Sequence, residues 1–331
     1  MTDVVLVSLG STLGLREADE QLAGALRRAG AEVVVATAAP QGPVRTMALT
    51  DLRWALAARR AAADAIARER PRAVLYSMTT AALLWPRAGG RDVVRAIRFD
   101  ALAADNRPGR HGIWQRPLER RRLRQAAVLV ASSPHPELPS AIVVPTPVEP
   151  SGAGAADAAE RDVAAVTYGA NPEKKGLDRV LKAWARARRD SEELVVVGTE
   201  GGVRPGVPDG VRFAGRLAPE EYRALLRRAR AFVAAPRRED YGIAQLEALA
   251  DGCLLVTTPA PGPYAALPIA RALDPRLVPD GPDGLAAAIR AALDDPGPGY
   301  AERALAALAP YRAEAVDRVV AERLLPALLG S

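Results

Sequence analysis

The sequence predicts an α/β protein made of two doubly wound parallel-sheet domains joined by a linker. Short apolar runs, which indicate buried strands, alternate along the chain with amphipathic helical segments, as they do in βαβ units. The alternation stops at residues 149–162, where small and polar residues show no apolar period, and then starts again. A chain of 331 residues, 49% of them apolar, is long enough for two hydrophobic cores. We therefore expect domains at 1–148 and 163–310 and a closing segment at 311–331.

The first domain begins as a βαβ unit, with strands predicted at 4–9 and 32–38 around a helix at 16–29. Gly10 and Ser11 form the turn after the first strand, where a backbone can approach a bound phosphate. The dinucleotide fingerprint G-x-G-x-x-G is absent from this turn, so a plain structural turn is the first interpretation and a phosphate-facing turn the second.

Asp100 follows a predicted strand at 92–99, at the sheet edge where parallel sheets bind ligands. There it could act as a base or orient a hydroxyl group, or it could simply cap a loop turn. The other elements predicted in this domain are helices at 52–70 and 79–85 and strands at 73–77, 127–131 and 142–148.

A basic helix extends from Arg116 to Arg124. It could face an anionic substrate or make a peripheral contact with a membrane surface. The chain contains 42 arginines and carries a net charge of +6, so a merely solvated helix face also explains the pattern.

The cysteine content and the lengths of the apolar runs indicate in which compartment the protein works. Cys253 is the single cysteine, so the chain cannot form an internal disulfide, and a reducing compartment is expected. No apolar run approaches the ~18 residues of a membrane span, and the first residues lead directly into a strand. We therefore expect a cytoplasmic protein that could associate with a membrane. No metal-ligand spacing is present, and we expect neither a metal nor a nucleic acid as partner.

Lys175 marks the start of the second domain. It lies in the loop G-A-N-P-E-K-K-G, between a strand predicted at 163–168 and a helix at 176–189. A lysine at a helix N-terminus opposes the helix dipole by a few tenths of a kcal/mol, and a bound phosphate would reverse that sign. A solvent-exposed lysine pair is the simpler alternative.

Two carboxylates mark the next predicted unit, which has strands at 231–235 and 253–257 around a helix at 242–251. Glu239 lies in the loop before this helix, and Glu247 shares a helix face with Ile243. We expect Glu247 to point toward the sheet, at an energetic cost that proteins usually accept only for a function such as binding hydroxyl groups. The alternative is that neither residue binds a ligand: Glu239 would be a first-turn glutamate favoured by the helix dipole, and Glu247 would reach water at the rim of the sheet.

The stretch E-D-Y-G-I-A-Q-L-E-A-L-A-D-G, which contains both carboxylates, resembles the donor-sugar motif of the retaining glycosyltransferases of family 4. The resemblance implies that Glu239 contacts the hydroxyls of a donor sugar and that Glu247 binds the nucleotide ribose. It also places the intervening motif residues at the donor: Asp240, Tyr241, Gly242 and Ile243.

The family pattern G-R-x-x-x-x-K-G is matched by Gly169, Lys175 and Gly176, which implies that Lys175 binds the donor diphosphate. Ala170 occupies the position of the family's arginine. We expect Arg237 or Arg238 to supply the missing charge.

The resemblance also implies the GT-B fold, in which the two domains face a cleft and the last helix, here 313–329, crosses back to the first domain. Gly10 and Ser11 would then approach the diphosphate, and Arg216 and Leu217 would flank the nucleobase. Phe99 stands where the family commonly has a histidine, which leaves Asp100 as the acceptor-side candidate.

The function implied is metal-independent transfer of a hexose, with retention, from a UDP- or GDP-linked sugar to a hydroxyl acceptor, with no cofactor. The acceptor could be a glycan, a lipid or a small metabolite. Two alternatives stay open. One is a sugar-nucleotide epimerase or phosphorylase of the same layout. The other is a non-catalytic nucleotide-binding relative that lost activity with the arginine at Ala170.

Overall fold

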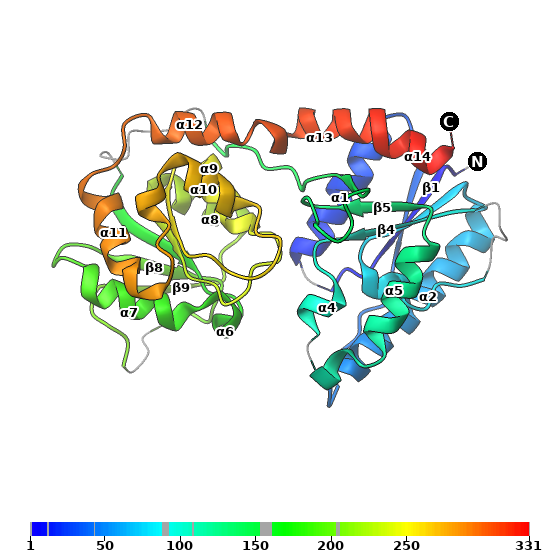
Figure 1. Cartoon of the computed structure of the whole chain (residues 1–331), viewed down its shortest axis with the longest axis horizontal. Helices are drawn as coiled ribbons and strands as arrows, with labels where there is room; N and C mark the ends of the chain where they lie inside the picture. Colours follow the sequence, from blue (N-terminus) through cyan, green and yellow to red (C-terminus); the bar gives the residue numbers. More distant parts are fainter. Residues whose placement is uncertain are drawn as a thin grey trace. The chain divides into compact units, whose positions relative to one another are not determined.

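The computed structural model describes residues 2–11, 13–42, 44–87, 93–107, 109–152, 161–202 and 206–330. These form two compact units, the first made of residues 1–147 and 313–331 and the second of residues 148–312. Each unit has a parallel sheet covered by helices (Figure 1). This is the predicted fold class. The predicted linker at 149–162 lies outside the described residues between 153 and 160.

The first unit contains a six-stranded parallel sheet in the order β2-β1-β3-β4-β5-β6. Its strands are β1 (Val4–Ser8), β2 (Val33–Thr37), β3 (Ala73–Tyr76), β4 (Val94–Phe99), β5 (Val128–Ala131) and β6 (Ile142–Val143). Its helices before the linker are α1 (Leu13–Arg28), α2 (Met47–Glu69), α3 (Thr79–Ala82), α4 (Ala103–Asn106) and α5 (Gln115–Gln125), with a 3₁₀ turn at Gly109–Gly112.

The central strands of this sheet are buried on both faces, which explains their continuous apolar runs. Successive side chains of β1 alternate between two cores: Val5 and Val7 pack into one, Val4 and Leu6 into the other.

The closing segment packs on the first unit, as the sequence predicted. It consists of α13 (Ala313–Val319), a π-helical turn (Val320–Leu324) and α14 (Leu325–Leu329). Its apolar stripe lies in the same core as β1, and Arg28 of α1 bonds both oxygens of Asp317 at 2.7 Å. Pro326 cannot donate a hydrogen bond to the carbonyl four residues before it, which accounts for the irregular turn inside the predicted helix.

The second unit contains a five-stranded parallel sheet in the order β11-β10-β7-β8-β9. Its strands are β7 (Val163–Tyr168), β8 (Leu194–Val197), β9 (Val211–Gly215), β10 (Ala229–Ala234) and β11 (Leu254–Thr257). Its helices are α6 (Pro172–Lys175), α7 (Leu177–Ala187), α8 (Pro219–Arg228), α9 (Ile243–Ala250), α10 (Ala266–Leu273), α11 (Leu285–Asp294) and α12 (Tyr300–Ala307), with short 3₁₀ turns at Pro275–Leu277, Pro282–Gly284 and Ala309–Tyr311.

The order of the strands matters for function, because β7 and β10 are direct neighbours and pair in parallel from Ala229↔Val163 to Phe232↔Val166. The loops that follow these two strands therefore leave the same edge of the sheet side by side.

Candidate functional site

The loop after β7 is pressed against the end of β10, and Gly176 makes this possible. Gly176 has φ +64°, and a Cβ there would lie 2.0 Å from the carbonyl oxygen of Ala235. The Arg237 N–H donates to the Lys174 carbonyl at 2.9 Å and ties the two loops together. The helix predicted at 176–189 is α7, and the predicted loop before it contains one further helical turn, α6, which Gly176 separates from α7. The break directs Lys175 toward the loop after β10.

Lys175 and Glu239 form an ion pair between these two loops. The Lys175 Nζ lies 2.9 Å from Oε1 and 2.7 Å from Oε2 of Glu239. The Gln245 amide of α9 donates to the same carboxylate at 3.0 Å. Glu239 is only 3% exposed, so this carboxylate is held in a protein environment rather than in water.

The loop after β11 supports Glu239 from the other side. The Glu239 N–H donates to the Pro261 carbonyl at 3.0 Å, and Gly262, with φ +108°, approaches so closely that a Cβ would lie 2.2 Å from the Glu239 carbonyl oxygen. Three βα loops, after β7, β10 and β11, therefore meet at Glu239: the first contacts its carboxylate and the third its backbone.

Charged residues around this pair are themselves paired. Lys174 bonds Asp240 at 2.5 Å, and Arg238 bonds the other oxygen at 2.9 Å. Burial raises the pKa of Asp240, but the hydrogen bond and charge of Lys174 and the charge of Arg238 outweigh it and hold that pKa below its usual value. Arg237 instead bonds both oxygens of Asp178 on α7, at 2.7 and 2.8 Å. Of the two arginines proposed to replace the one missing at Ala170, Arg238 therefore lies within the Lys174–Asp240 cluster.

The remaining motif residues form the start of α9. Tyr241 is 8% exposed, and Gly242, with φ +89°, lies so close to Tyr264 that a Cβ would be 2.9 Å from its ring. Ile243 begins the helix and is 38% exposed. A small pocket beside them is lined by Tyr168, Phe232, Ala234, Pro236, Ala244, Gln245 and Lys175.

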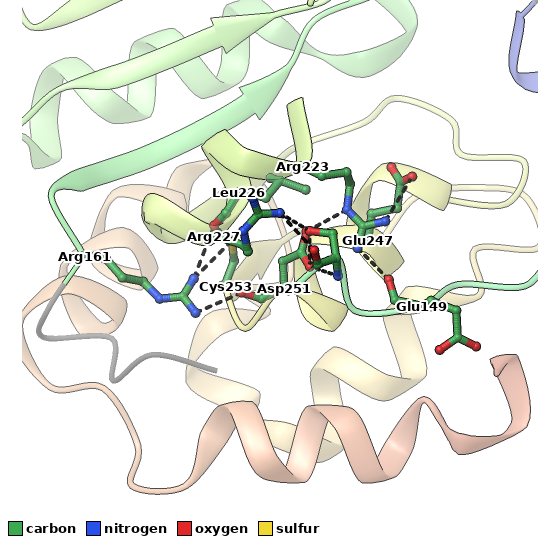
Figure 2. Close-up of polar contacts among 9 residues, drawn as sticks. Glu149, Arg161, Arg223, Leu226, Arg227, Glu247, Asp251 and Cys253 are labelled. Carbon is green, nitrogen blue, oxygen red and sulfur yellow. Dashed lines mark hydrogen bonds and ion pairs between the residues drawn. The ribbon is translucent and has the colours of Figure 1, made fainter. Parts of the chain in front are cut away.

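Glu247 does not point toward the sheet, and that expectation is wrong. Its side chain is 26% exposed and faces α8, where Arg223 Nη1 lies 3.8 Å from its Oε1 (Figure 2). The helix face that it shares with Ile243 is the partly exposed one, because α9 packs against strands on one side and against α10 and α12 on another. Those contacts bury Leu246 and Leu249 instead.

Tyr168 links Glu247 to the pocket beside Lys175. Tyr168 lines that pocket, and burial together with the charge of Glu247 raises the pKa of its hydroxyl. The charge of Arg216 acts on the pKa of Tyr168 in the opposite direction. Arg216 is exposed and Leu217 half-buried, directly after β9.

The candidates of the first unit lie at the carboxyl edge of its own sheet. Gly10 has φ +57°, and its carbonyl accepts a hydrogen bond from Arg16 at 2.8 Å; Ser11 is exposed. Asp100 follows β4 and accepts a hydrogen bond from the Ser132 hydroxyl at the end of β5.

Beside them lies a buried carboxyl group that was not among the residues predicted from the sequence. Asp19 of α1 is 1% exposed and accepts a hydrogen bond from Ser8 at 2.5 Å, with Arg98 at 3.6 Å. Burial raises the pKa of Asp19, against the lowering effects of Ser8 and Arg98. Helical spacing in the sequence could have identified Asp19 as buried, because it lies three and four residues before Leu22 and Ala23, which are both buried.

The basic helix α5 is not simply solvated. Glu119 is 3% exposed and accepts a hydrogen bond from the Ala103 N–H at 2.7 Å, while the Arg122 guanidinium stacks over the Trp85 ring at 4.6 Å. Arg116 and Arg120 lie one turn apart on the face that lines a second pocket. The full lining of this pocket is Leu102, Ala104, Arg116, Glu119, Arg120, Leu123, Arg124, Glu137 and Leu138.

Metal sites and membrane spans are both absent from the described part of the chain. No group of histidine, cysteine and carboxylate side chains there could hold a metal ion. None of the helices in the described ranges combines the length and the apolar character needed to cross a membrane.

Comparisons with known proteins agree with this architecture. Residues 162–295 match the family model described as Glycosyl transferases group 1. The whole chain is similar in structure to a sucrose-phosphate synthase from Thermosynechococcus elongatus, with a TM-score of 0.74 and 16% identity over 100% of both chains.

Two further solved structures are similar. WaaG, a glycosyltransferase involved in lipopolysaccharide biosynthesis, has a TM-score of 0.69 and 16% identity over 100% of both chains. Anabaena HepE, solved in complex with UDP and glucose, has a TM-score of 0.67 and 14% identity over 98% of this chain and 99% of its own. At such identities the likeness shows the shared GT-B fold. No curated protein sequence matches the chain.

Proposed function

We propose that this chain, whose residues 162–295 match the family model of Glycosyl transferases group 1, is a retaining, metal-independent hexosyltransferase. It would move a sugar from a UDP- or GDP-linked donor to a hydroxyl acceptor. The observation that carries the proposal is the Lys175–Glu239 pair, because two residues singled out for separate donor roles meet where three βα loops converge.

The pair has the chemistry that a sugar diphosphate requires. A lysine ammonium has three hydrogen-bond donors, and Glu239 engages two of them, so the third can face a phosphate oxygen. Fixed in this way, Lys175 would stabilise the negative charge that develops on the departing diphosphate. A carboxylate accepts about four hydrogen bonds, and Lys175 and Gln245 supply three to Glu239, which leaves capacity for a sugar hydroxyl.

The rest of the donor would extend along the same sheet edge. We assign Glu247 to the ribose and Arg216 with Leu217 to the nucleobase, as the family resemblance implies. Arg216 and Leu217 directly follow β9, and Glu247 lies on α9, beyond the loop that carries Glu239. Arg238 is the stronger candidate for the charge missing at Ala170, because its partner Asp240, in the loop that carries Glu239, lies beside Lys174. Arg237 is instead directed to Asp178 on α7.

The first unit would serve the acceptor. We assign Asp100 to the acceptor hydroxyl, as a base or as a group that orients it, while the leaving phosphate helps to remove the proton. The pocket along α5 combines leucines with Arg116, Arg120 and Arg124, which suits an acceptor that carries an anionic group next to an apolar body, such as a lipid phosphate.

Donor binding and turnover test the proposal together. A panel of UDP- and GDP-sugars should include one that raises the melting temperature by mass action. With that donor, Lys175→Ala and Glu239→Ala should each lower kcat about 10²-fold or more. Lys182→Ala is the matched control, since this exposed lysine of α7 should leave turnover unchanged. Near-wild-type activity of Lys175→Ala or Glu239→Ala would contradict the assignment.

The same assay separates the alternatives. Release of a sugar phosphate, or conversion of the sugar nucleotide without any acceptor, would indicate a phosphorylase or an epimerase. A donor that binds but is never turned over, with any acceptor tested, would indicate a non-catalytic relative.

The acceptor pocket is tested separately. Arg120→Ala combined with Arg124→Ala should lower kcat/KM about tenfold or more for acceptors that carry a phosphate, and little for uncharged ones. Arg121→Ala, on the same helix but outside the pocket lining, should change neither. An equal loss for charged and uncharged acceptors would refute the anionic site.

A further inference from the structure

Arg223 of α8 connects the candidate ribose carboxylate to two fixed points of the second unit (Figure 2). Its Nε donates to Asp251 Oδ2 at 2.6 Å, and its Nη2 donates to the carbonyl of Glu149 at 2.7 Å. Its third corner, Nη1, lies 3.8 Å from Glu247 Oε1. Because a guanidinium is planar, the first two bonds determine where the third nitrogen lies.

The first anchor, Asp251, is itself held firmly, and the Glu149 side chain pairs with Arg312 at 3.2 Å. The Asp251 side chain is only 1% exposed, and it also accepts hydrogen bonds from the N–H and the hydroxyl of Ser151 at 2.8 and 2.9 Å. The Asp251 N–H donates to the Glu247 carbonyl at 2.9 Å, so the anchor lies on the same helical turn as the carboxylate. Glu149 belongs to the first described residues of the predicted linker.

We propose that Arg223 is a positioning residue for Glu247, which holds this carboxylate in the orientation that receives the ribose hydroxyls of the nucleotide. Arg223 does not itself touch the ribose. A partly exposed glutamate samples several rotamers, and a charged partner fixed on both sides favours one of them before the nucleotide arrives. The inference rests on the proposed assignment of Glu247 to the ribose.

Arg227, one turn further along α8, provides a matched control. It also bonds this part of the linker, through the hydroxyl and carbonyl of Ser151, and it is also an arginine of α8. The contacts found for Arg227 within the described residues do not include Glu247. Replacing it therefore tests the loss of a linker contact without the loss of the contact to the carboxylate.

The experiment compares ribose with 2′-deoxyribose. Dissociation constants are measured by calorimetry for UDP, GDP, ADP and CDP and for their 2′-deoxy forms, with wild type, Glu247→Ala, Arg223→Ala, Arg223→Lys and Arg227→Ala. For the preferred base, wild type should bind the ribonucleotide about tenfold or more tightly than the deoxy form, as for a hydrogen bond to a charged acceptor. Glu247→Ala should lose this discrimination.

Arg223→Ala should reduce the discrimination below about threefold, while Arg227→Ala should keep the wild-type ratio. Arg223→Lys keeps the charge and can still pair with the buried Asp251, but a single ammonium cannot also reach both Glu149 and Glu247. Arg223→Lys should therefore fold and still lose the discrimination between ribose and deoxyribose. It tests the proposal even if Arg223→Ala does not fold. A purely structural role would weaken both nucleotides equally and leave the ratio unchanged.

The outcomes separate the two ideas. If Glu247→Ala abolishes discrimination but the Arg223 variants keep it, the positioning role is refuted and the ribose assignment stands. If wild type does not discriminate, or binds none of the four nucleotides, the ribose assignment fails and the positioning role fails with it.

Discussion

Gly176→Ala should reduce activity without touching a substrate, because it separates the loop that carries Lys175 from the end of β10. Gly176 has φ +64°, a backbone conformation that costs a residue with a Cβ about 1–2 kcal/mol. In addition, the new Cβ would lie 2.0 Å from the Ala235 carbonyl oxygen, against 3.4 Å for an ordinary contact. The two backbones must move apart by about 1.4 Å.

That displacement acts on the ion pair next to it. The bonds from Lys175 to Glu239 are 2.9 and 2.7 Å long, so a shift of this size breaks at least one of them. A misplacement of ~1 Å at a reacting centre can cost about 10²-fold in rate. We expect Gly176→Ala to lower kcat by about that factor and to destabilise the second unit by more than the ~1–2 kcal/mol of backbone strain alone.

Gly299→Ala is a control that introduces the backbone strain of a positive φ without a steric collision of the new Cβ. Gly299 also begins a helix, with φ +63°, but the nearest atoms to its Cβ would lie at 3.5 and 3.6 Å, which is ordinary contact. Donor turnover measured as nucleotide release, and stability from urea midpoints, should show both losses for Gly176→Ala and only a small loss of stability for Gly299→Ala. If Gly176→Ala keeps kcat within about threefold of wild type, the close approach does not position Lys175.

Three further predictions follow from the contacts in the second unit. Glu239→Gln keeps the shape of the side chain but removes the charge opposite Lys175, so kcat should fall about 10²-fold, as measured by nucleotide release; an unchanged kcat would show that shape alone suffices. Arg238→Ala should weaken donor binding about tenfold or more in calorimetry while Arg237→Ala should not, and two unchanged variants would refute the replacement of the arginine missing at Ala170. A hydrogen bond from Arg276 lowers the pKa of Asp274 in the folded protein below its ordinary 3.8. The ionised Asp274 therefore stabilises the fold at pH values above 3.8, and this stabilisation is lost as the pH falls through the lower pKa of the folded state. Asp274→Asn should therefore lower the urea midpoint at pH 7 and differ less from wild type near pH 3, and a constant difference would contradict the linkage.

Local residue patterns were sufficient to predict the helices and strands and to predict which loops lie at the carboxyl edge of each sheet. Continuous apolar runs predict strands buried on both faces, as in β1 and β10, because a doubly wound sheet leaves no polar face. Since parallel strands end at a common edge, the sequence also indicated that the loops with Lys175 and Glu239 would emerge at the same edge of the second sheet. Both loops lie within residues 162–295, which match the model of a glycosyltransferase family.

The direction of single side chains depended on packing that no local pattern contains. Helical spacing placed Glu247 with Ile243, but which face of α9 would be buried was decided by α10 and α12, helices that come later in the chain. Likewise, Arg223 meets Asp251 and Glu149 across 28 and 74 positions of sequence. Such partners have no fixed spacing, so a sequence pattern cannot pair them.

The sequence by itself determined which residues are candidates for the donor chemistry, because charged side chains that follow buried parallel strands lie at the edge where such sheets bind ligands. Only the tertiary structure decided how they are held: Lys175 against Glu239 through the close approach at Gly176, and Glu247 beside Arg223 rather than the sheet. The physical reason is the reach of the interactions. Hydrophobic period and turn chemistry act within a few residues, whereas an ion pair or a backbone collision depends on distances that the whole unit sets when it folds.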